Sequence, residues 1–96
     1  MRAVEVSPRA AREIDRVEEW WWEHRPKAPG AVADDLASAF ELLAERAEIK
    51  APVASRGIRR LYLSRIRYYL YYRIRDERVV DVLSLWHASR DDEPVL

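Results

Sequence analysis

The fold is decided by residues 58–87, which read IRRLYLSRIRYYLYYRIRDERVVDVLSLWH. β-Branched and aromatic residues recur at a period of two, which predicts three strands, Ile58–Leu63, Tyr68–Arg75 and Val79–His87. The connectors are short enough only for hairpins, so these strands should form an antiparallel meander. The last strand is apolar on both faces, as expected of a central strand that is covered on each side.

The preceding sequence predicts one more strand and two helices. Residues 2–6 alternate polar and apolar side chains, and Ser7 and Pro8 then favour a helix start. Apolar residues recur at helical spacing in two stripes, which are Ala10, Ile14, Val17 and Trp21, then Val32, Leu36, Phe40, Leu43 and Ala47. The first helix should end near Arg25, before Pro26, Pro29 and Gly30. We therefore expect an α+β fold of order β-α-α-β-β-β, with a helical hairpin on one face of a small, antiparallel-rich sheet.

Length and composition narrow the class of protein. Ninety-six residues leave room for one hydrophobic core, so we expect a single domain over residues 1–96. The absence of cysteine and the presence of only two histidines argue against a disulfide framework and a metal site, and we expect no cofactor. No long apolar run resembles a signal peptide or a membrane span. We expect a soluble cytoplasmic protein without a membrane partner.

The formal net charge of zero hides an asymmetry between the two halves. Residues 1–48 carry 7 basic and 11 acidic side chains, a net charge of −4, and residues 49–96 carry 10 and 6, a net charge of +4. The stretch from Arg56 to Arg78 contains eight arginines and only two acidic residues, which gives a local charge of +6. This bias favours an acidic partner or phosphate groups, the alternative being that the arginines only edge a solvated sheet face.

Three consecutive tryptophans, Trp20, Trp21 and Trp22, cannot all lie on one face of a helix. Trp21 belongs to the apolar stripe, so we expect at least one of its neighbours to be partly exposed. Exposed aromatic rings are enriched where partners dock. The alternative is that the neighbouring helix buries both flanking rings.

The strand at residues 68–75 carries four tyrosines that alternation divides between its two faces. Tyr69 and Tyr71 share a face with Arg73 and Arg75, and such a surface can stack on bases or grip a protein. The alternative is ordinary cross-strand packing.

His87 is the better-placed candidate for proton transfer, because imidazole titrates near neutral pH. Cleavage of RNA through the 2′-hydroxyl would also need a cation, which Arg59, Arg60 or Arg90 can supply, and a second proton-transfer group, which the sequence does not provide. The alternative is a structural His87. His24, in the last turn of the first helix, more simply favours the helix dipole.

Several segments together resemble one family. Gly57–Leu61, Arg67–Ile74 and Val82–Arg90 resemble the ParE/RelE superfamily of type II toxins, particularly its ParE-like members, and Val4–Ala10 is similar to that family's opening strand and helix start. The resemblance covers essentially the whole chain, and it depends on the order and spacing of the segments together.

The resemblance implies a toxin that a ParD-like antitoxin neutralises in a hetero-oligomer, with the antitoxin's C-terminal segment wrapping the helices and the sheet. The residues expected to bind the antitoxin are Trp20, Trp22, Tyr69, Tyr71 and Arg73. Family members divide into toxins that block DNA gyrase and ribosome-dependent mRNA endonucleases. At two nuclease positions this chain has Tyr69 and Ala88, and its last six residues contain no tyrosine.

Gyrase inhibition is therefore the expected function, through binding and without catalytic residues. The expected target-binding residues are Arg59, Arg60, Arg67, Trp86, His87 and Arg90. No sequence-specific nucleic-acid binding is expected of the toxin alone. In the alternative, an mRNA endonuclease, the catalytic residues would be His87, Arg59, Arg60 and Arg90.

Overall fold

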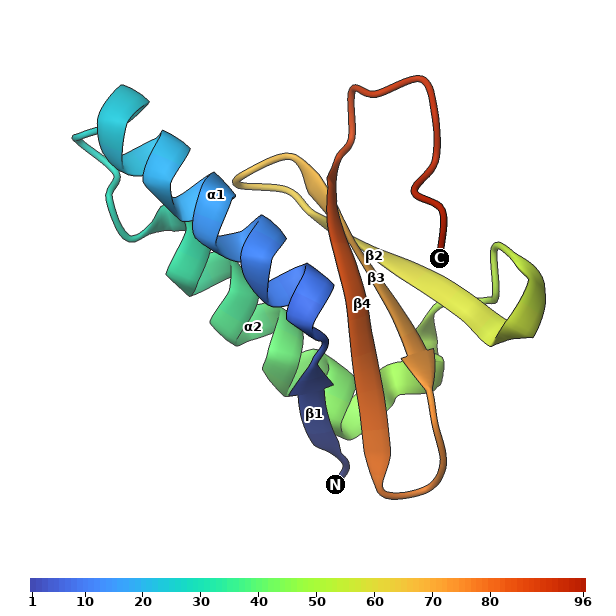
Figure 1. Cartoon of the computed structure of the whole chain (residues 1–96). Coiled ribbons are helices and arrows are strands. Elements are labelled where there is room, and N and C mark those ends of the chain that lie inside the picture. Colours follow the sequence, from blue (N-terminus) through green and yellow to red (C-terminus); the bar gives the residue numbers. More distant parts are fainter.

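The computed structural model describes residues 1–96 and contains every strand and helix expected from the sequence, which confirms the α+β class (Figure 1). The elements are β1 (Ala3–Val6), α1 (Pro8–His24), α2 (Ala31–Arg46), β2 (Ile58–Leu63), β3 (Tyr68–Ile74) and β4 (Val79–His87), with 3-10 turns at Ala47–Ile49 and Ser55–Gly57. The expected ends of β1, α1 and β3 differ from the observed ends by one residue. Neither α1 nor α2 combines the length and the apolar character needed to cross a bilayer.

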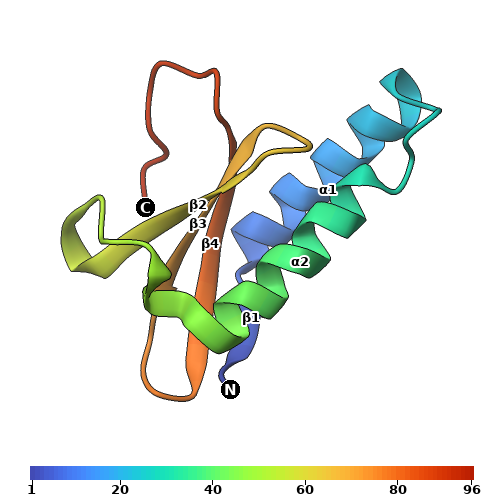
Figure 2. The same cartoon turned by 180° about the vertical axis from the view of Figure 1, so that it is seen from behind.

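The four strands form one mixed sheet in the order β1-β4-β3-β2, with β4 in the interior as its apolar sequence predicts. β3 runs antiparallel to both of its neighbours, whereas β1 pairs in parallel with β4. The chain thus leaves one edge of the sheet, passes through both helices and returns at the opposite edge. Both helices cover the same face of the sheet, and no helix covers the other (Figures 1 and 2).

Ser7 begins α1 and also ties it to β4. Its hydroxyl accepts a hydrogen bond from the Ala10 amide at 3.1 Å and donates one to the Leu83 carbonyl at 3.3 Å. Six residues further along the chain, the Glu13 carboxylate accepts a hydrogen bond from the Leu85 amide at 3.2 Å. Because β1 is only four residues long, these side chains satisfy backbone groups of β4 that lie beyond its reach.

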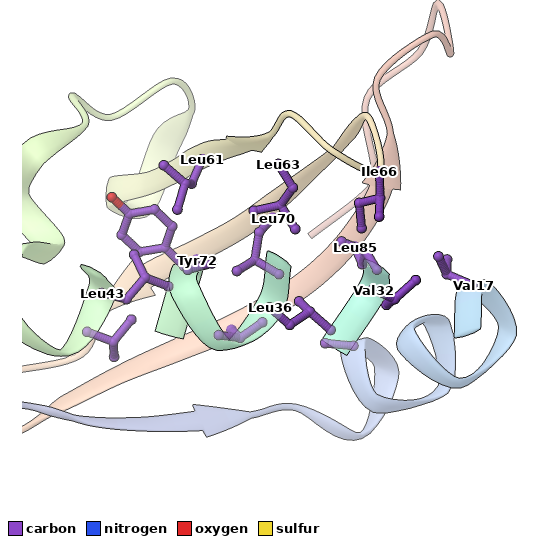
Figure 3. Close-up of a cluster of buried hydrophobic side chains, with 14 of the residues drawn as sticks. Val17, Val32, Leu36, Leu43, Leu61, Leu63, Ile66, Leu70, Tyr72 and Leu85 are labelled. Carbon is purple, nitrogen blue, oxygen red and sulfur yellow. The ribbon is translucent and has the colours of Figure 1, made fainter. Parts of the chain in front are cut away.

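The hydrophobic core lies between the helices and the sheet (Figure 3). Its members include Val17, Val32, Leu36 and Leu43 from the helices, Leu61, Leu63, Leu70, Tyr72 and Leu85 from the sheet, and Ile66 from the turn between β2 and β3. The buried Tyr72 hydroxyl donates to the Ala47 carbonyl at 2.7 Å, which ties β3 to the end of α2. Of the expected core residues, Ile14, Trp21 and Phe40 are only partly buried against this cluster.

A β-bulge interrupts the pairing of β3 with β4. Tyr71 pairs with Ser84 but Tyr72 pairs with Val82, so Leu83 has no partner on β3. As a result Val82 and Leu85, three residues apart, both belong to the core. The bulge therefore reverses the faces of β4, and Asp81 points away from the helices beside its cross-strand partner Arg73.

The start of α2 holds the turn between β2 and β3. The Asp35 carboxylate accepts hydrogen bonds from the amides of Arg65 and Ile66 at 3.0 and 3.1 Å. Asp34 adds an exposed ion pair to the Arg65 guanidinium at 3.1 Å. Arg67 ends the turn with a left-handed φ of 62°. These contacts fix the position of the hairpin relative to the helices.

Candidate functional site

The face of the sheet opposite the helices carries arginines stacked on aromatic rings. We call this surface the open face and define it by Arg60, Tyr62, Tyr69, Tyr71 and Trp86. The Arg60 guanidinium lies 4.2 Å from the centre of the Tyr69 ring and donates to the Tyr71 hydroxyl at 3.4 Å. The hydrogen bond to Tyr71 is the main cause that raises the pKa of Arg60 above its ordinary value. Arg60 therefore offers a fixed positive charge next to flat apolar rings.

Trp86 is the second stacking site of the open face. The Arg90 guanidinium lies 3.8 Å from the centre of its ring, and the Arg9 guanidinium approaches the same ring at 6.0 Å. The indole Nε1 donates to the Asp92 carbonyl at 3.1 Å. Of the expected target-binding residues, Arg60, Trp86 and Arg90 thus come together on this face.

Arg73 and Arg75 share the sheet face of Tyr69 and Tyr71, as expected, but their charges are neutralised. Arg75 is hydrogen bonded to Asp81 and pairs with Glu5 at 3.1 Å, and Arg73 lies 3.5 Å from Asp81. The hydrogen bonds from Arg75 hold the pKa of Asp81 below its ordinary value. Tyr71 is buried, with 4% of its surface exposed. Of the other residues expected to bind an antitoxin on the sheet, Tyr69 and Arg73 are both half-buried.

Arg59 is separated from the other expected target-binding residues. It pairs with Tyr72, whose side chain enters the core, so Arg59 points toward the helix side of β2. Its guanidinium donates to the carbonyls of Lys50 and Glu48, the latter at 3.5 Å. The hydrogen bonds of the Arg59 guanidinium thus go to the segment that follows α2.

A groove of about 910 Å³ lies where the end of α1, the turn between β2 and β3, and the end of β4 meet. We call it the end groove. Its lining includes the rings of Trp20, Trp21, Tyr62, Tyr68 and His87 and the guanidinium groups of Arg25, Arg65 and Arg67, and it contains no carboxylate. An aromatic and basic groove of this kind favours an acidic segment that carries apolar side chains.

The tryptophans of α1 are exposed to different extents, as expected from their sequence positions. Trp20 and Trp22 are 45% and 69% exposed, whereas Trp21 packs against the core. Trp20 stacks on His24 with ring centres 4.6 Å apart, and the Arg25 guanidinium lies 5.5 Å from its ring. The expectation that at least one ring of the triplet is exposed is confirmed.

His87 lies between the end groove and the open face and lines hollows on both. Its Nδ1 accepts a hydrogen bond from the Ser89 amide at 3.1 Å, so the proton of the neutral ring is on Nε2. Tyr68 meets the ring edge-on, with centres 4.8 Å apart, and burial raises the pKa of the Tyr68 phenol. The Ser89 amide therefore engages the Nδ1 lone pair of His87.

Sequence reasoning missed residues from two parts of this surface. Arg25 and Tyr62 come from different elements, and only the fold brings them to the end groove. Asp81, which pairs with both Arg73 and Arg75, carried a signal: it is the only acidic residue in the apolar sequence of β4.

Three comparisons with known proteins agree with this fold. The family model described as the ParE toxin of the type II toxin–antitoxin system parDE matches residues 4–92. A toxin named RelE3 from Caulobacter vibrioides is 32% identical over 82 residues, which are 83% of this chain and 88% of that protein. A solved chain of the chromosomal ParDE toxin–antitoxin system from P. aeruginosa has a similar fold, with a TM-score of 0.76 and 17% identity over 93% of this chain and 98% of that one. The chain belongs to the ParE toxin family of type II toxin–antitoxin systems.

Proposed function

We propose that this toxin inhibits DNA gyrase by binding to it, and that a cognate ParD-like antitoxin neutralises the toxin in a hetero-oligomer. Inhibition by binding needs a contact surface and no reacting groups. The observation that carries the proposal is the open face, where Arg60 and Arg90 lie over Tyr69 and Trp86. Arginine and aromatic residues are the types most enriched at the centres of protein interfaces. The proposed target would place the toxin in the cytoplasm.

The second candidate function is an mRNA endonuclease, and the observation that favours it is His87. This histidine and Arg67 line the same groove, and the relative from Caulobacter vibrioides bears the name RelE3. The reaction would still need a general base beside the scissile phosphate. Because the Ser89 amide donates to the Nδ1 of His87, that nitrogen is already engaged, and the arrangement supports binding better than proton transfer.

The end groove is the proposed seat of the antitoxin. Its lining is basic and aromatic, and the neighbouring Trp22 offers a further exposed ring. An acidic segment that folds on binding can place carboxylates against Arg25 and Arg67 and apolar side chains against Trp20. Tyr69, on the open face, belongs to a different surface. An antitoxin that contacts both surfaces must pass around the end of the sheet.

The test of the main proposal is a supercoiling assay with purified gyrase and toxin. Wild-type toxin should inhibit supercoiling, and Arg60→Glu should weaken inhibition by about tenfold or more, as expected at the centre of an interface. The matched control is Arg12→Glu, because Arg12 is an exposed arginine of α1 outside both surfaces. Supercoiling that persists at a stoichiometric excess of folded wild-type toxin would refute gyrase inhibition.

Induced expression separates the two functions in cells. Growth arrest with altered plasmid topology and intact mRNA is the result expected of a gyrase inhibitor. Arrest with codon-phased mRNA cleavage that His87→Ala abolishes would instead support the endonuclease. Co-expression of the antitoxin should restore growth in either case, and the antitoxin should fail to protect when Trp20→Ala and Arg67→Glu are combined.

A further inference from the structure

The chain after β4 folds back over the open face of the sheet. Figures 1 and 2 show residues 88–96 leaving the end of β4, turning and descending on the side of the sheet away from the helices. The Asp92 carbonyl accepts a hydrogen bond from the Trp86 indole at 3.1 Å, and the Val95 carbonyl accepts one from Arg9. Arg90 also pairs with the Asp92 carboxylate at 3.4 Å. The last six residues therefore lie against the surface that we propose as the target site.

The first half of this segment complements the open face in charge. Asp91, Asp92 and Glu93 are three consecutive acidic residues, and they line one hollow of about 190 Å³ together with Arg60 and Trp86. The negative charge of Glu93 is one of the causes that raise the pKa of Arg60. An acidic segment thus meets the arginine that carries the proposed function.

The second half of the segment complements the face in polarity. Val95 and Leu96 line another hollow, of about 250 Å³, that also contains Ile58 and Leu83. Leu83 is the unpaired residue of the bulge in β4. The segment DDEPVL therefore places carboxylates beside Arg60 and the partly covered Leu96 beside Ile58 and Leu83.

The contacts that hold this segment are few and exposed. Val95 is 88% exposed, and the ion pair between Arg90 and Asp92 has both side chains more than half exposed. Exposed ion pairs contribute little to stability, so the segment detaches at small cost. Because the segment belongs to the same chain, it nevertheless competes with other ligands for the open face at an effective concentration on the order of millimolar.

We propose that residues 91–96 form an intramolecular strap that occupies the open face, and that an acidic surface of the target must displace the strap before the toxin binds. This inference rests on the proposed function only for the place where the target binds. The strap lowers the affinity of the free toxin for its target and reserves the face for acidic, apolar segments.

The strap can be released in the 96-residue chain by Asp91→Asn, Asp92→Asn and Glu93→Gln together. The matched control removes the same charge from exposed positions of α1 by Glu18→Gln, Glu19→Gln and Glu23→Gln. A labelled peptide of sequence DDEPVL is the probe, because it reports the vacant face without gyrase. It should bind the strap variant roughly 3- to 10-fold more tightly than the wild type or the control, as expected from the loss of two or three exposed charge contacts.

Gyrase binding should increase by a similar factor in the strap variant and remain unchanged in the control. Equal affinity of the peptide for all three proteins would show that the strap does not occupy the face. A vacated face with unchanged gyrase affinity would equally overturn the proposal, because the target would then bind elsewhere. If no protein binds gyrase while the peptide still discriminates, the proposed function fails and strap occupancy stands.

Discussion

The two faces of the sheet are built from the same strands but differ in what covers them. On the helix side, two helices bury side chains such as Leu70 and Tyr72 completely. On the open side, a six-residue segment covers arginines and aromatic rings, and Tyr62 remains 46% exposed. Alternation along one strand thus gives neighbouring residues opposite roles. Stability comes mainly from the helix side, which leaves residues of the open face available for binding.

The largest effect should come from a truncation on the helix side. Leu70→Ala removes a fully buried side chain from the centre of the core and should lower the free energy of unfolding by about 3 kcal/mol. The adjacent substitution Tyr69→Ala removes a larger side chain from the open face and should cost about 1 kcal/mol or less. Urea denaturation of both variants measures the difference. Equal costs would mean that the open face is part of the structural core.

A smaller effect should come from Asp35, which connects the helices to the sheet. Asp35→Ala leaves the amides of Arg65 and Ile66 without their acceptor and should lower the free energy of unfolding by about 2 kcal/mol. Asp34→Ala removes only an exposed ion pair and should cost about 0.5 kcal/mol or less. Hydrogen exchange should locate the loss for Asp35→Ala at the turn. A uniform change throughout the sheet would contradict this local role.

Asp81 gives the open face a contribution to stability that depends on pH. Its pKa is lowered in the folded chain by Arg75, so the stabilisation is fully present above the ordinary pKa of an aspartate and is lost as the pH falls through the lowered value. Asp81→Asn should cost about 1 kcal/mol at pH 7, where it weakens the contacts of two half-exposed arginines. The difference between wild type and variant should shrink on acidification toward pH 3, below the ordinary aspartate pKa of about 3.9. A constant difference in denaturation experiments would assign the effect to packing.

The fold was predictable because periodicity and turn lengths leave few arrangements for this chain. A period of two located β2, β3 and β4, and short connectors required hairpins. The bulge at Leu83 was not predictable, since it depends on tertiary packing that brings both Val82 and Leu85 into the core. Strict alternation would have placed Asp81 with Leu85 on the helix side. The single extra residue of the bulge therefore decides which face of the sheet carries the ion pairs of Asp81.

The site was predictable only in part, because residue type indicates chemistry but not neighbours. The structure brings Arg60, Trp86 and Arg90 of the expected target-binding set to one face of the sheet, whereas Arg59 points to the other side of β2. The count of arginines overstated the available positive charge, because Asp81 and Glu5 neutralise Arg75. Adding up the charges along a stretch of sequence cannot identify acidic partners that come from distant strands. Such pairs become visible only when the register is known.

The smallest effect on stability should come from Trp22, which tests whether exposed rings serve binding. Trp22 is 69% exposed on α1, so Trp22→Ala should change the free energy of unfolding by no more than about 0.5 kcal/mol. Trp21→Ala is the matched control and should cost about 2 to 3 kcal/mol, because Trp21 packs against the core. If Trp22 docks the antitoxin, calorimetry should record weaker binding by Trp22→Ala at unchanged stability. Unchanged affinity would leave Trp20 as the docking ring and confine the antitoxin seat to the end groove.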